Sequence, residues 1–340
     1  MTFADLVQQA AAAKATDLHV VGGRRAFVRV DGALRPLDDK PFSPRVVEAL
    51  LKEAVGEAGW KKFSDTMELD APYQGGGVRL RLNLHISQGL PALSARLIPA
   101  TVPSFADLGI SETIQSFAEL PDGLVLFTGP TGSGKSTALA SILQAINTVR
   151  PAHIVTLEDP VEYVFDAGQG IVKQREVGMD TISFAEGLRR CLRQDPDVIM
   201  VGEMRDPETI AAALTLAETG HLVFSTLHTS SAAQAVNRIV DSFSGSMQDQ
   251  ARHQLSLSLR AVVAQRLFPR VGGGLVAARE ILLNTPAVGN LIRENKLEQV
   301  GSVLQTGRAD GMVPMERAVE ALLKNGSISK EAAAPFLSAR

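Results

Sequence analysis

The segment GPTGSGKST, from Gly129 to Thr137, decides the fold, because it matches the phosphate-loop pattern GxxxxGK[ST] at every defined position. The apolar run Leu124–Phe127 stands just before it and predicts a buried parallel strand. Ala138–Val149 follows and predicts a helix with aliphatic side chains on one face. A strand, a glycine-rich loop and a helix in this order predict that the chain binds a nucleoside triphosphate.

The loop residues have separate expected parts in binding. The glycines let main-chain N–H groups face a phosphate, and the helix start adds partial positive charge. Lys135 is expected to reach the β and γ phosphates, and Ser136 to hold Mg²⁺. ATP and Mg²⁺ are therefore the predicted cofactors. The predicted nucleotide-binding residues are Gly129, Pro130, Thr131, Gly132, Ser133, Gly134, Lys135, Ser136 and Thr137.

The bulk composition narrows the class of protein. A chain of 340 residues exceeds what one core usually holds, which predicts two domains. No apolar run approaches the roughly 18 residues of a membrane span, and the N-terminus lacks the features of a signal peptide, so a cytoplasmic location is expected. The net charge of -3 offers no footprint for nucleic acid, which argues against a DNA-translocating ring.

The single cysteine, Cys191, cannot form an internal disulfide or supply a zinc cluster. Its surroundings, LRRCLRQ, are typical of a helix, and a buried structural thiol is expected.

The first hundred residues predict a small α+β domain. Helical spacing is found in Phe3–Lys14 and from Ser43 to Val55. The expected strands are 17–21, a hairpin over 27–37 that turns at Asp31-Gly32, then 78–86 and 92–98. Pro99–Pro103 cannot continue a helix or a central strand, so the boundary is placed there. The predicted division is 1–98 for the N-terminal domain, 99–110 for a linker and 111–340 for an α/β domain with a C-terminal helical part.

Two arginines of this domain are candidate ligands for a neighbouring subunit's phosphates. Arg81 alternates with the apolar face of strand 78–86, and Arg96 lies on the next strand. The residues alone leave open whether they reach a nucleotide or form a solvated sheet face.

After Gly123 the pattern predicts alternating strands and helices, and two of these strands end in carboxylates. His153–Leu157 is followed by Glu158, and Val198–Val201 by Gly202-Glu203. The carboxyl ends of parallel strands form the edge where ligands bind. ATP hydrolysis needs one carboxylate for water and another for Mg²⁺. Glu158 and Glu203 are the candidates, and the residues leave open which takes which role.

Histidines flank a further predicted strand, His221–His228. Both are candidates for sensing the γ phosphate or for signalling between subunits. His228 is the better placed, because it stands at the carboxyl end. Arg189, Arg190 and Arg193, on the helix before the second acidic strand, are expected to face a neighbouring subunit or solvent.

Four segments together carry a family resemblance. GPTGSGKST, TLEDPVEY at 156–163, DPDVIMVGEMRDPET at 195–209 and AETGHLVFSTLHTSSA at 217–232 resemble the Walker A, Asp box, Walker B and His box of the secretion ATPase superfamily. NLIRENK at 290–296 and SVLQTG at 302–307 are similar to the C-terminal motif of its type IV pilus retraction (twitching motility) ATPases. KATDLHV at 14–20 is similar to their N-terminal domain.

The resemblance implies a RecA-like phosphate-loop ATPase domain and a smaller PAS-like N-terminal domain. It also implies a homohexamer in which each N-terminal domain packs on the next subunit. Glu158 matches the catalytic glutamate and Glu203 the Walker B glutamate, a candidate Mg²⁺ residue with Ser136. His221 and His228 match the His box, and Arg81 and Arg96 match arginines that approach the nucleotide. The residues that match the retraction motif are Leu291, Ile292, Arg293 and Glu294.

The expected function is ATP hydrolysis that drives pilus retraction. The expected partners are an inner-membrane platform protein, which would hold the enzyme at that membrane, and a paralogous retraction ATPase. An assembly or type II secretion ATPase remains an alternative, although its usual four-cysteine zinc element is missing. The second alternative is a low-turnover ATP-binding accessory subunit of a retraction motor. The sequence departs from the family pattern in the loop Tyr73–Gly77 and at residues 286–289.

Overall fold

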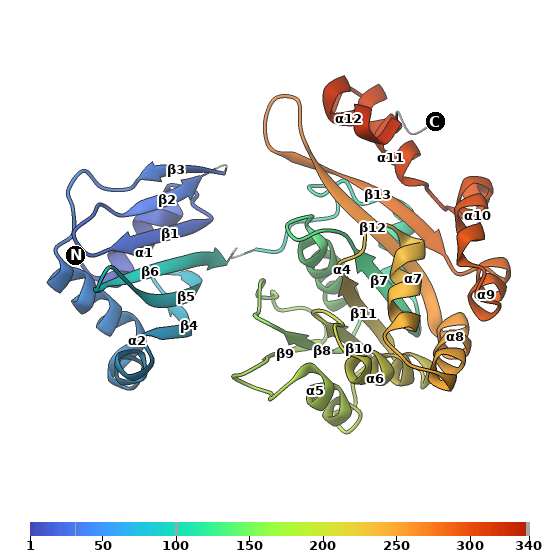
Figure 1. Ribbon diagram of the computed structural model, residues 1–340, viewed down its shortest axis with the longest axis horizontal. Helices are drawn as coiled ribbons and strands as arrows, with labels where there is room; N and C mark the ends of the chain where they lie inside the picture. The colour runs from blue at the N-terminus through green and yellow to red at the C-terminus, as the bar shows by residue number, and fades with distance from the viewer. Residues whose placement is uncertain (31, 99–100, 338–340) are drawn as a thin grey trace. The chain divides into compact units, whose positions relative to one another are not determined.

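The computed structural model describes residues 1–30, 32–98 and 101–337. It divides into two compact units, one of Met1–Thr101 with Glu162–Val164 and one of Val102–Val161 with Phe165–Arg340 (Figure 1). Asp31 of the predicted turn lies outside the described residues. So do Pro99 and Ala100, where the predicted linker 99–110 begins.

The first unit is a six-stranded antiparallel sheet with two helices, in the strand order β3-β2-β1-β6-β5-β4. This confirms the predicted α+β organisation. The elements are α1 (Phe3–Ala12), β1 (Asp17–Val21), β2 (Phe27–Val30), β3 (Ala33–Pro36), α2 (Pro44–Thr66), β4 (Glu68–Gly75), β5 (Val78–Ser87) and β6 (Leu90–Ile98).

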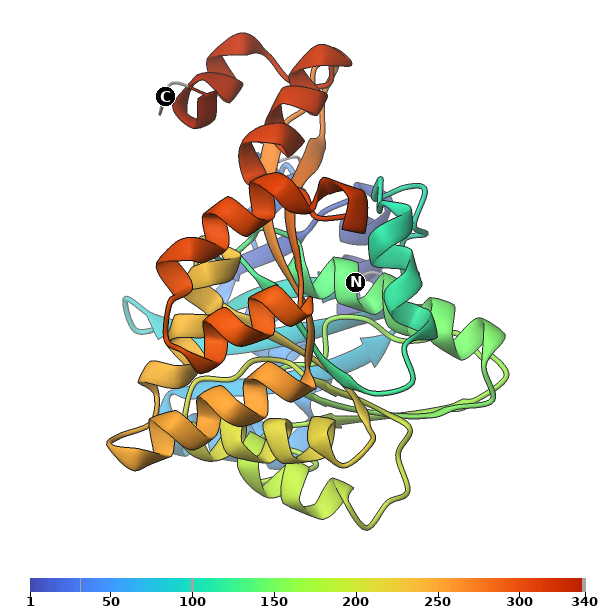
Figure 2. The same cartoon turned by 90° about the vertical axis from the view of Figure 1, so that its right-hand side faces the viewer.

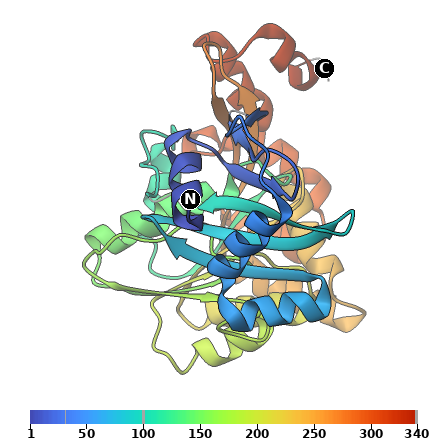
Figure 3. The same ribbon diagram turned by 90° about the vertical axis from the view of Figure 1, so that its left-hand side faces the viewer.

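One hydrophobic core joins α1 and α2 to this sheet. Alternate residues of β5, from Leu80 to Leu84, turn inward with Phe3 and Leu51 of the two helices. Figure 3 shows both helices in front of the strands. A regular alternation along β5 is therefore enough to fix which face is covered.

The predicted loop Tyr73–Gly77 is wrong in extent. Residues up to Gly75 belong to β4, and Tyr73 pairs with Leu80 of β5. The Tyr73 ring packs edge-on against Phe3, with ring centroids 4.8 Å apart. The glycines suggested a long loop, but Leu69, Ala71 and Tyr73 alternate toward the core and extend the strand.

The second unit is a seven-stranded sheet with helices on both faces. Its described elements are α3 (Glu112–Gln115), η1 (Ser116–Glu119), β7 (Gly123–Thr128), α4 (Lys135–Val149), β8 (His153–Glu158), β9 (Ile171–Glu176), α5 (Phe184–Cys191), β10 (Val198–Val201), α6 (Pro207–Glu218), β11 (Leu222–Leu227), α7 (Ala232–Asp241), α8 (Ser246–Ser258), β12 (Leu259–Pro269), β13 (Leu275–Leu283), α9 (Pro286–Arg293), η2 (Leu297–Gln299), α10 (Val300–Thr306), η3 (Gly307–Asp310), α11 (Met315–Lys324) and α12 (Lys330–Leu337).

The strand order is β13-β12-β7-β11-β10-β8-β9, and every neighbouring pair is parallel except β12 with β13. The expected alternation of strands and helices therefore fails twice. No helix separates β8 from β9, and β12 with β13 forms an antiparallel hairpin. The central strands β7, β10 and β11 are buried along their whole length, as runs of apolar residues predict.

Two separate helical layers cover the sheet. One face packs on α4 with α3 and η1, and the other packs on a layer that runs from α5 to α10. Figure 2 turns the latter layer toward the viewer. Helices α11 and α12 pack with the hairpin residues Ala264 and Phe268 in a smaller cluster.

Two boundaries differ from the sequence predictions. Helix α4 begins at Lys135, so the end of the motif already forms its first turn. Helix α5 ends at Cys191, which leaves Arg193 outside it, while Arg189 and Arg190 both face Glu186. The predicted buried thiol is confirmed, and burial raises the pKa of Cys191.

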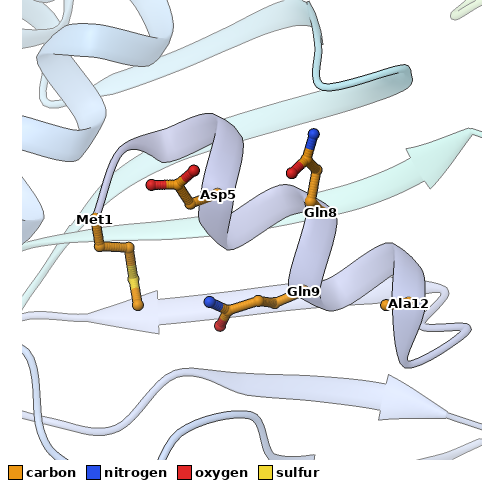
Figure 4. Close-up of a pocket in the computed structure, with 5 residues that line it drawn as sticks. All are labelled: Met1, Asp5, Gln8, Gln9 and Ala12. Atoms are coloured by element: carbon orange, nitrogen blue, oxygen red, sulfur yellow. The ribbon is translucent and has the colours of Figure 1, made fainter.

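A shallow hollow lies on α1 beside Met1, Asp5, Gln8, Gln9 and Ala12 (Figure 4). The Asp5 carboxylate there accepts the Thr2 N–H and closes the helix start. We therefore assign this hollow no binding role. In the part of the chain that the structure describes, no helix is both long and apolar enough to cross a membrane.

Candidate active site

The carboxyl edge of the parallel sheet gathers the predicted catalytic residues. The phosphate loop follows β7, His228 follows β11, Glu203 lies just beyond β10, and Glu158 ends β8. These four strands are neighbours in that order. Strands lie about 4.8 Å apart, so the four groups form one row at the edge where such sheets bind ligands.

Backbone geometry explains the glycines of the phosphate loop. Gly129, Gly132 and Gly134 have φ of +148°, +77° and +81°. A Cβ on Gly129 would lie 2.3 Å from the carbonyl oxygen of Gln265, so no other residue fits there.

Lys135 is buried at the start of α4, where its Nζ donates to the carbonyl oxygens of Gly129 at 2.8 Å and Pro130 at 3.1 Å. The ammonium group is thus held against the loop. Pro130 and Thr131 are exposed, and Ser136 and Thr137 are half-buried on the first turn of α4. The loop therefore presents main-chain groups, one cation and hydroxyl groups together, which is the chemistry that a polyphosphate requires.

Glu203 forms a polar cluster with two neighbours. Its Oε2 accepts from Arg205 Nε at 2.7 Å and lies 3.1 Å from His228 Nε2. Its side chain is 13% exposed, whereas that of Arg205 is 74% exposed. Arg205 was not identified from the sequence as a contact of Glu203. Its position two residues after Glu203 was the available signal.

Hydrogen bonds hold the loop that carries His228 beside the phosphate loop. The N–H of Thr229 donates to Thr128 Oγ1 at 2.9 Å, and Thr128 is the last residue of β7. The hydroxyl of Thr226 donates to the carbonyl of Gly202 at 2.6 Å. These bonds fix the ends of three adjacent strands relative to one another.

Glu158 is more enclosed than Glu203, with 7% of its surface exposed. Its Oε1 accepts from Thr156 Oγ1 at 2.6 Å and from Gln174 Nε2 at 3.0 Å. Gln174 lies on β9, a strand that the sequence pattern did not reveal, so this contact was missed.

His221 lies elsewhere. It precedes β11, at the amino edge of the sheet, where its Nδ1 contacts the carbonyl oxygen of Leu216 at 3.0 Å. The strand of six residues, Leu222–Leu227, separates it from His228. Within the chain, the two histidines of the predicted His box do not meet.

Arg81 and Arg96 of the first unit lie directly opposite each other on β5 and β6. Arg96 forms an ion pair with Asp17 of β1 at 3.1 Å, and both arginine side chains are exposed. Two like charges on one exposed sheet face make a surface suited to an anion.

The predicted retraction motif occupies the end of α9. Ile292 is fully buried and Leu291 is half-buried against the α5–α10 layer. Glu294 is exposed, and a hydrogen bond from Lys296 lowers its pKa. Arg293 lies 3.4 Å from Ser256 Oγ on α8, close to the beginning of β12 and therefore toward the amino edge of the sheet. The motif is thus on the edge opposite to the phosphate loop.

Two buried residues next to the phosphate loop were not anticipated. Gln265 on β12 donates to the carbonyl of Ser133 at 2.6 Å and accepts from Arg279 on β13 at 2.7 Å. Burial lowers the pKa of Arg279 to about 10, so it stays charged near neutral pH. The hairpin that carries both was absent from the predicted alternation, and this is why they were missed.

A metal at this edge would depend on the nucleotide. Among the described residues, no three His, Cys, Asp or Glu side chains gather closely enough to hold a metal ion. Mg²⁺ usually takes one or two protein oxygens together with phosphate oxygens and water. The hydroxyl of Ser136 and the carboxylate of Glu203 fit that donor set.

A parallel sheet with a glycine loop, a buried lysine and two carboxylates at one edge defines the class of phosphate-loop nucleotide-binding proteins. The chain belongs to the type II/IV secretion system protein family, whose sequence profile matches residues 2–326. The family resemblance and the fold class stated above are thereby confirmed. The chain is a phosphate-loop ATPase of the secretion ATPase family.

The chain is 44% identical over 332 residues to the type IV pilus retraction ATPase PilT of Pseudomonas aeruginosa, covering 97% of this chain and 96% of that protein. It is 47% identical over 309 residues to a twitching motility protein of Neisseria gonorrhoeae, covering 90% of this chain and 83% of that one. A crystal structure of the pilus retraction motor PilT with bound ADP superposes with a TM-score of 0.92 at 42% identity, covering 99% of this chain and 97% of that chain.

Proposed function

We propose that this protein is the motor that hydrolyses ATP to retract type IV pili. The observation that carries the proposal is the row at the carboxyl edge, in which the phosphate loop, His228, Glu203 and Glu158 end adjacent strands. The whole-length similarity to retraction ATPases supports the direction of the force.

The phosphate loop binds the triphosphate. Its main-chain N–H groups and the start of α4 hold the phosphates, and Lys135 turns from the carbonyls of Gly129 and Pro130 toward the β and γ phosphates. Ser136 and Glu203 are the residues that would hold Mg²⁺, which when bound neutralises charge on the phosphates.

Glu158 is the stronger candidate for the base that orients and deprotonates water. It ends β8 at the carboxyl edge, where it accepts hydrogen bonds from Thr156 and Gln174 that hold its carboxylate in place. Glu203 instead shares one oxygen between Arg205 and His228. His228 is placed to sense the state of Glu203 and so to report hydrolysis.

The proposed assembly is a homohexamer on the cytoplasmic side of the inner membrane. Arg81 and Arg96 would approach the nucleotide of a neighbouring subunit, because their exposed pair suits an anion. His221, at the opposite edge from His228, would act between subunits. The motif at 291–294 would serve transmission of force to an inner-membrane platform protein, with a paralogous ATPase as a further partner.

The deciding experiment is deletion of the gene in the source organism. Cells that keep or accumulate surface pili but lose twitching are the expected result. Cells without pili would point to the alternative, an assembly or secretion ATPase. A purified oligomer that binds ATP but shows no turnover would favour the accessory-subunit alternative.

A further inference from the structure

The phosphate loop belongs to a row of neighbouring residues that runs across strands β7, β12 and β13. Thr128, just before the loop, pairs with Ala264 of β12, which brings Gly129 beside Gln265. Gln265 in turn pairs directly with Arg279 of β13. The loop, Gln265 and Arg279 are therefore neighbours across the sheet, although up to 150 positions separate them in the chain.

Side chains connect the members of this row. The Gln265 carboxamide forms hydrogen bonds through both of its polar atoms. Its Nε2 donates to the Ser133 carbonyl at 2.6 Å, and its Oε1 accepts from Arg279 Nε at 2.7 Å. Gln265 is 2% exposed and Arg279 8%. A buried amide with both ends bonded has one orientation, so it can hold the loop in one conformation.

Arg279 extends the connection to a third segment. Its Nη1 donates to the carbonyl of Gly109 at 2.9 Å and its Nη2 to that of Leu108 at 3.0 Å. None of the ion pairs found among residues 1–30, 32–98 and 101–337 includes Arg279. Burying a cation among neutral acceptors is costly, which favours a use beyond simple packing.

We propose that Gln265 and Arg279 are positioning residues that hold the phosphate loop ready for ATP and transmit its occupancy to Leu108–Gly109. This segment leads, in sequence, to the N-terminal unit. The inference rests on the proposed ATP-binding function of the loop. Neither residue contacts the nucleotide, and both act through the main chain of Ser133.

Peptide geometry supplies the physical reason. The Ser133 carbonyl and the Gly134 N–H belong to one planar trans peptide and point in opposite directions. When Gln265 holds the carbonyl, the Gly134 N–H is turned away from Gln265 and its direction is fixed. Phosphate binding depends on such aligned N–H groups. A change in the loop on binding therefore moves Gln265, then Arg279, and then the carbonyls of residues 108 and 109.

The first test is ATP affinity in the full-length protein. Gln265→Glu keeps an acceptor for Arg279 but loses the donor to Ser133, whereas Arg279→Gln loses the link to 108–109. Arg260→Gln is the matched control, because Arg260 on β12 also bonds a main-chain carbonyl, that of Asp122, at the amino end of β7.

We expect the Kd and KM for MgATP to rise about ten-fold or more in Gln265→Glu, with a smaller change in kcat, and to stay within about two-fold in Arg260→Gln. Unchanged ATP affinity in a folded Gln265→Glu protein would overturn the inference. So would an equal loss in the Arg260→Gln control. Should Gln265→Glu fail to fold, Gln265→Met takes its place with the same expected result.

The second test is hydrogen exchange in a peptide covering 104–110, where the amides of Leu108, Gly109 and Ile110 bond within one turn. We expect a non-hydrolysable ATP analogue to change this exchange in the wild-type protein and not in Arg279→Gln at saturating analogue. The same response in both would refute the transmission. A wild-type protein that binds no analogue would instead refute the proposed function, so the two failures are distinguishable.

Discussion

The two edges of the seven-stranded sheet differ in what their polar side chains contact. At the carboxyl edge, side chains meet one another around the phosphate loop, as His228 meets Glu203 and Gln174 meets Glu158. At the amino edge they lie against the ends of helices, as His221 contacts the carbonyl oxygen of Leu216 on α6 and Arg293 lies near Ser256 on α8. One edge is arranged for chemistry and the other closes the ends of the helices.

This difference follows from the fold. In a parallel sheet with helices on both faces, the loops after the strands surround an open edge, while those before the strands return directly from helices. The same residue type therefore has different uses at the two edges. Histidine is the clearest case here, because one stands at each end of β11.

The substitution Lys135→Gln, at the carboxyl edge, should cause the largest loss of ATP turnover. We expect ATP turnover to fall at least about a hundred-fold, because the lysine of the segment Gly129–Thr137 no longer balances the developing phosphate charge. Steady-state phosphate release measures this. The amino-edge variant Arg260→Gln serves as the control. Near-normal turnover in Lys135→Gln would contradict the assignment of catalysis to the carboxyl edge.

The two carboxylates give the next effect. Glu203→Gln and Glu158→Gln should each lower kcat by roughly 10² to 10⁴, and Glu203→Gln should still bind ATP. Single-turnover hydrolysis and nucleotide binding are the measurements. If one of the variants hydrolyses ATP at the normal rate, that acid has been assigned wrongly.

Variants of the two histidines compare the two edges at the ends of a single strand, β11. His228→Asn removes a contact to a charged group and should lower kcat about ten-fold. His221→Asn loses a contact to a main-chain carbonyl and should change kcat by no more than about three-fold. Parallel kinetic assays of the purified proteins decide it, and a reversed order would contradict the assignment by edge.

The exposed part of the α9 motif should affect movement more than hydrolysis. We expect Glu294→Ala to leave kcat within about two-fold, since an exposed ion pair contributes little to stability, and to reduce twitching. Hydrolysis in vitro and twitching zones on agar are measured together. Glu298→Ala, also exposed and just outside the motif, is the control. Equal twitching in the two variants would speak against a role of Glu294 in retraction.

The smallest effect concerns stability. Burial raises the pKa of Glu280, a β13 residue that accepts the N–H of Ala232 at 2.8 Å. The folded state therefore holds the proton more tightly than the unfolded state, whose pKa is near 4.5. The stability that Glu280 contributes is fully present below pH 4.5 and is lost as the pH rises to the raised pKa.

Denaturant unfolding of wild type and Glu280→Gln at several pH values tests this. The variant should lack that part of the decline. An identical pH dependence in both proteins would show that Glu280 does not cause it.

Much of the site could be predicted because its signals are local. The phosphate loop carries its glycines, lysine and hydroxyls in nine consecutive residues, and Glu158 and Glu203 each stand at the end of an apolar run. The contacts to Gln174, Gln265 and Arg279 could not be predicted. They come from β9, β12 and β13, which the expected alternation of strands and helices does not contain.

The sequence by itself determined that a nucleotide-binding loop lies between a strand and a helix, and that two acids end neighbouring strands of the same sheet. These are short-range properties, since backbone freedom at glycine and burial of apolar runs depend on adjacent residues. Only the tertiary structure decided that Gln174 contacts Glu158 and that a buried arginine supports the loop through Gln265. Strand order and register decide such contacts, because they bring together residues that no local pattern connects.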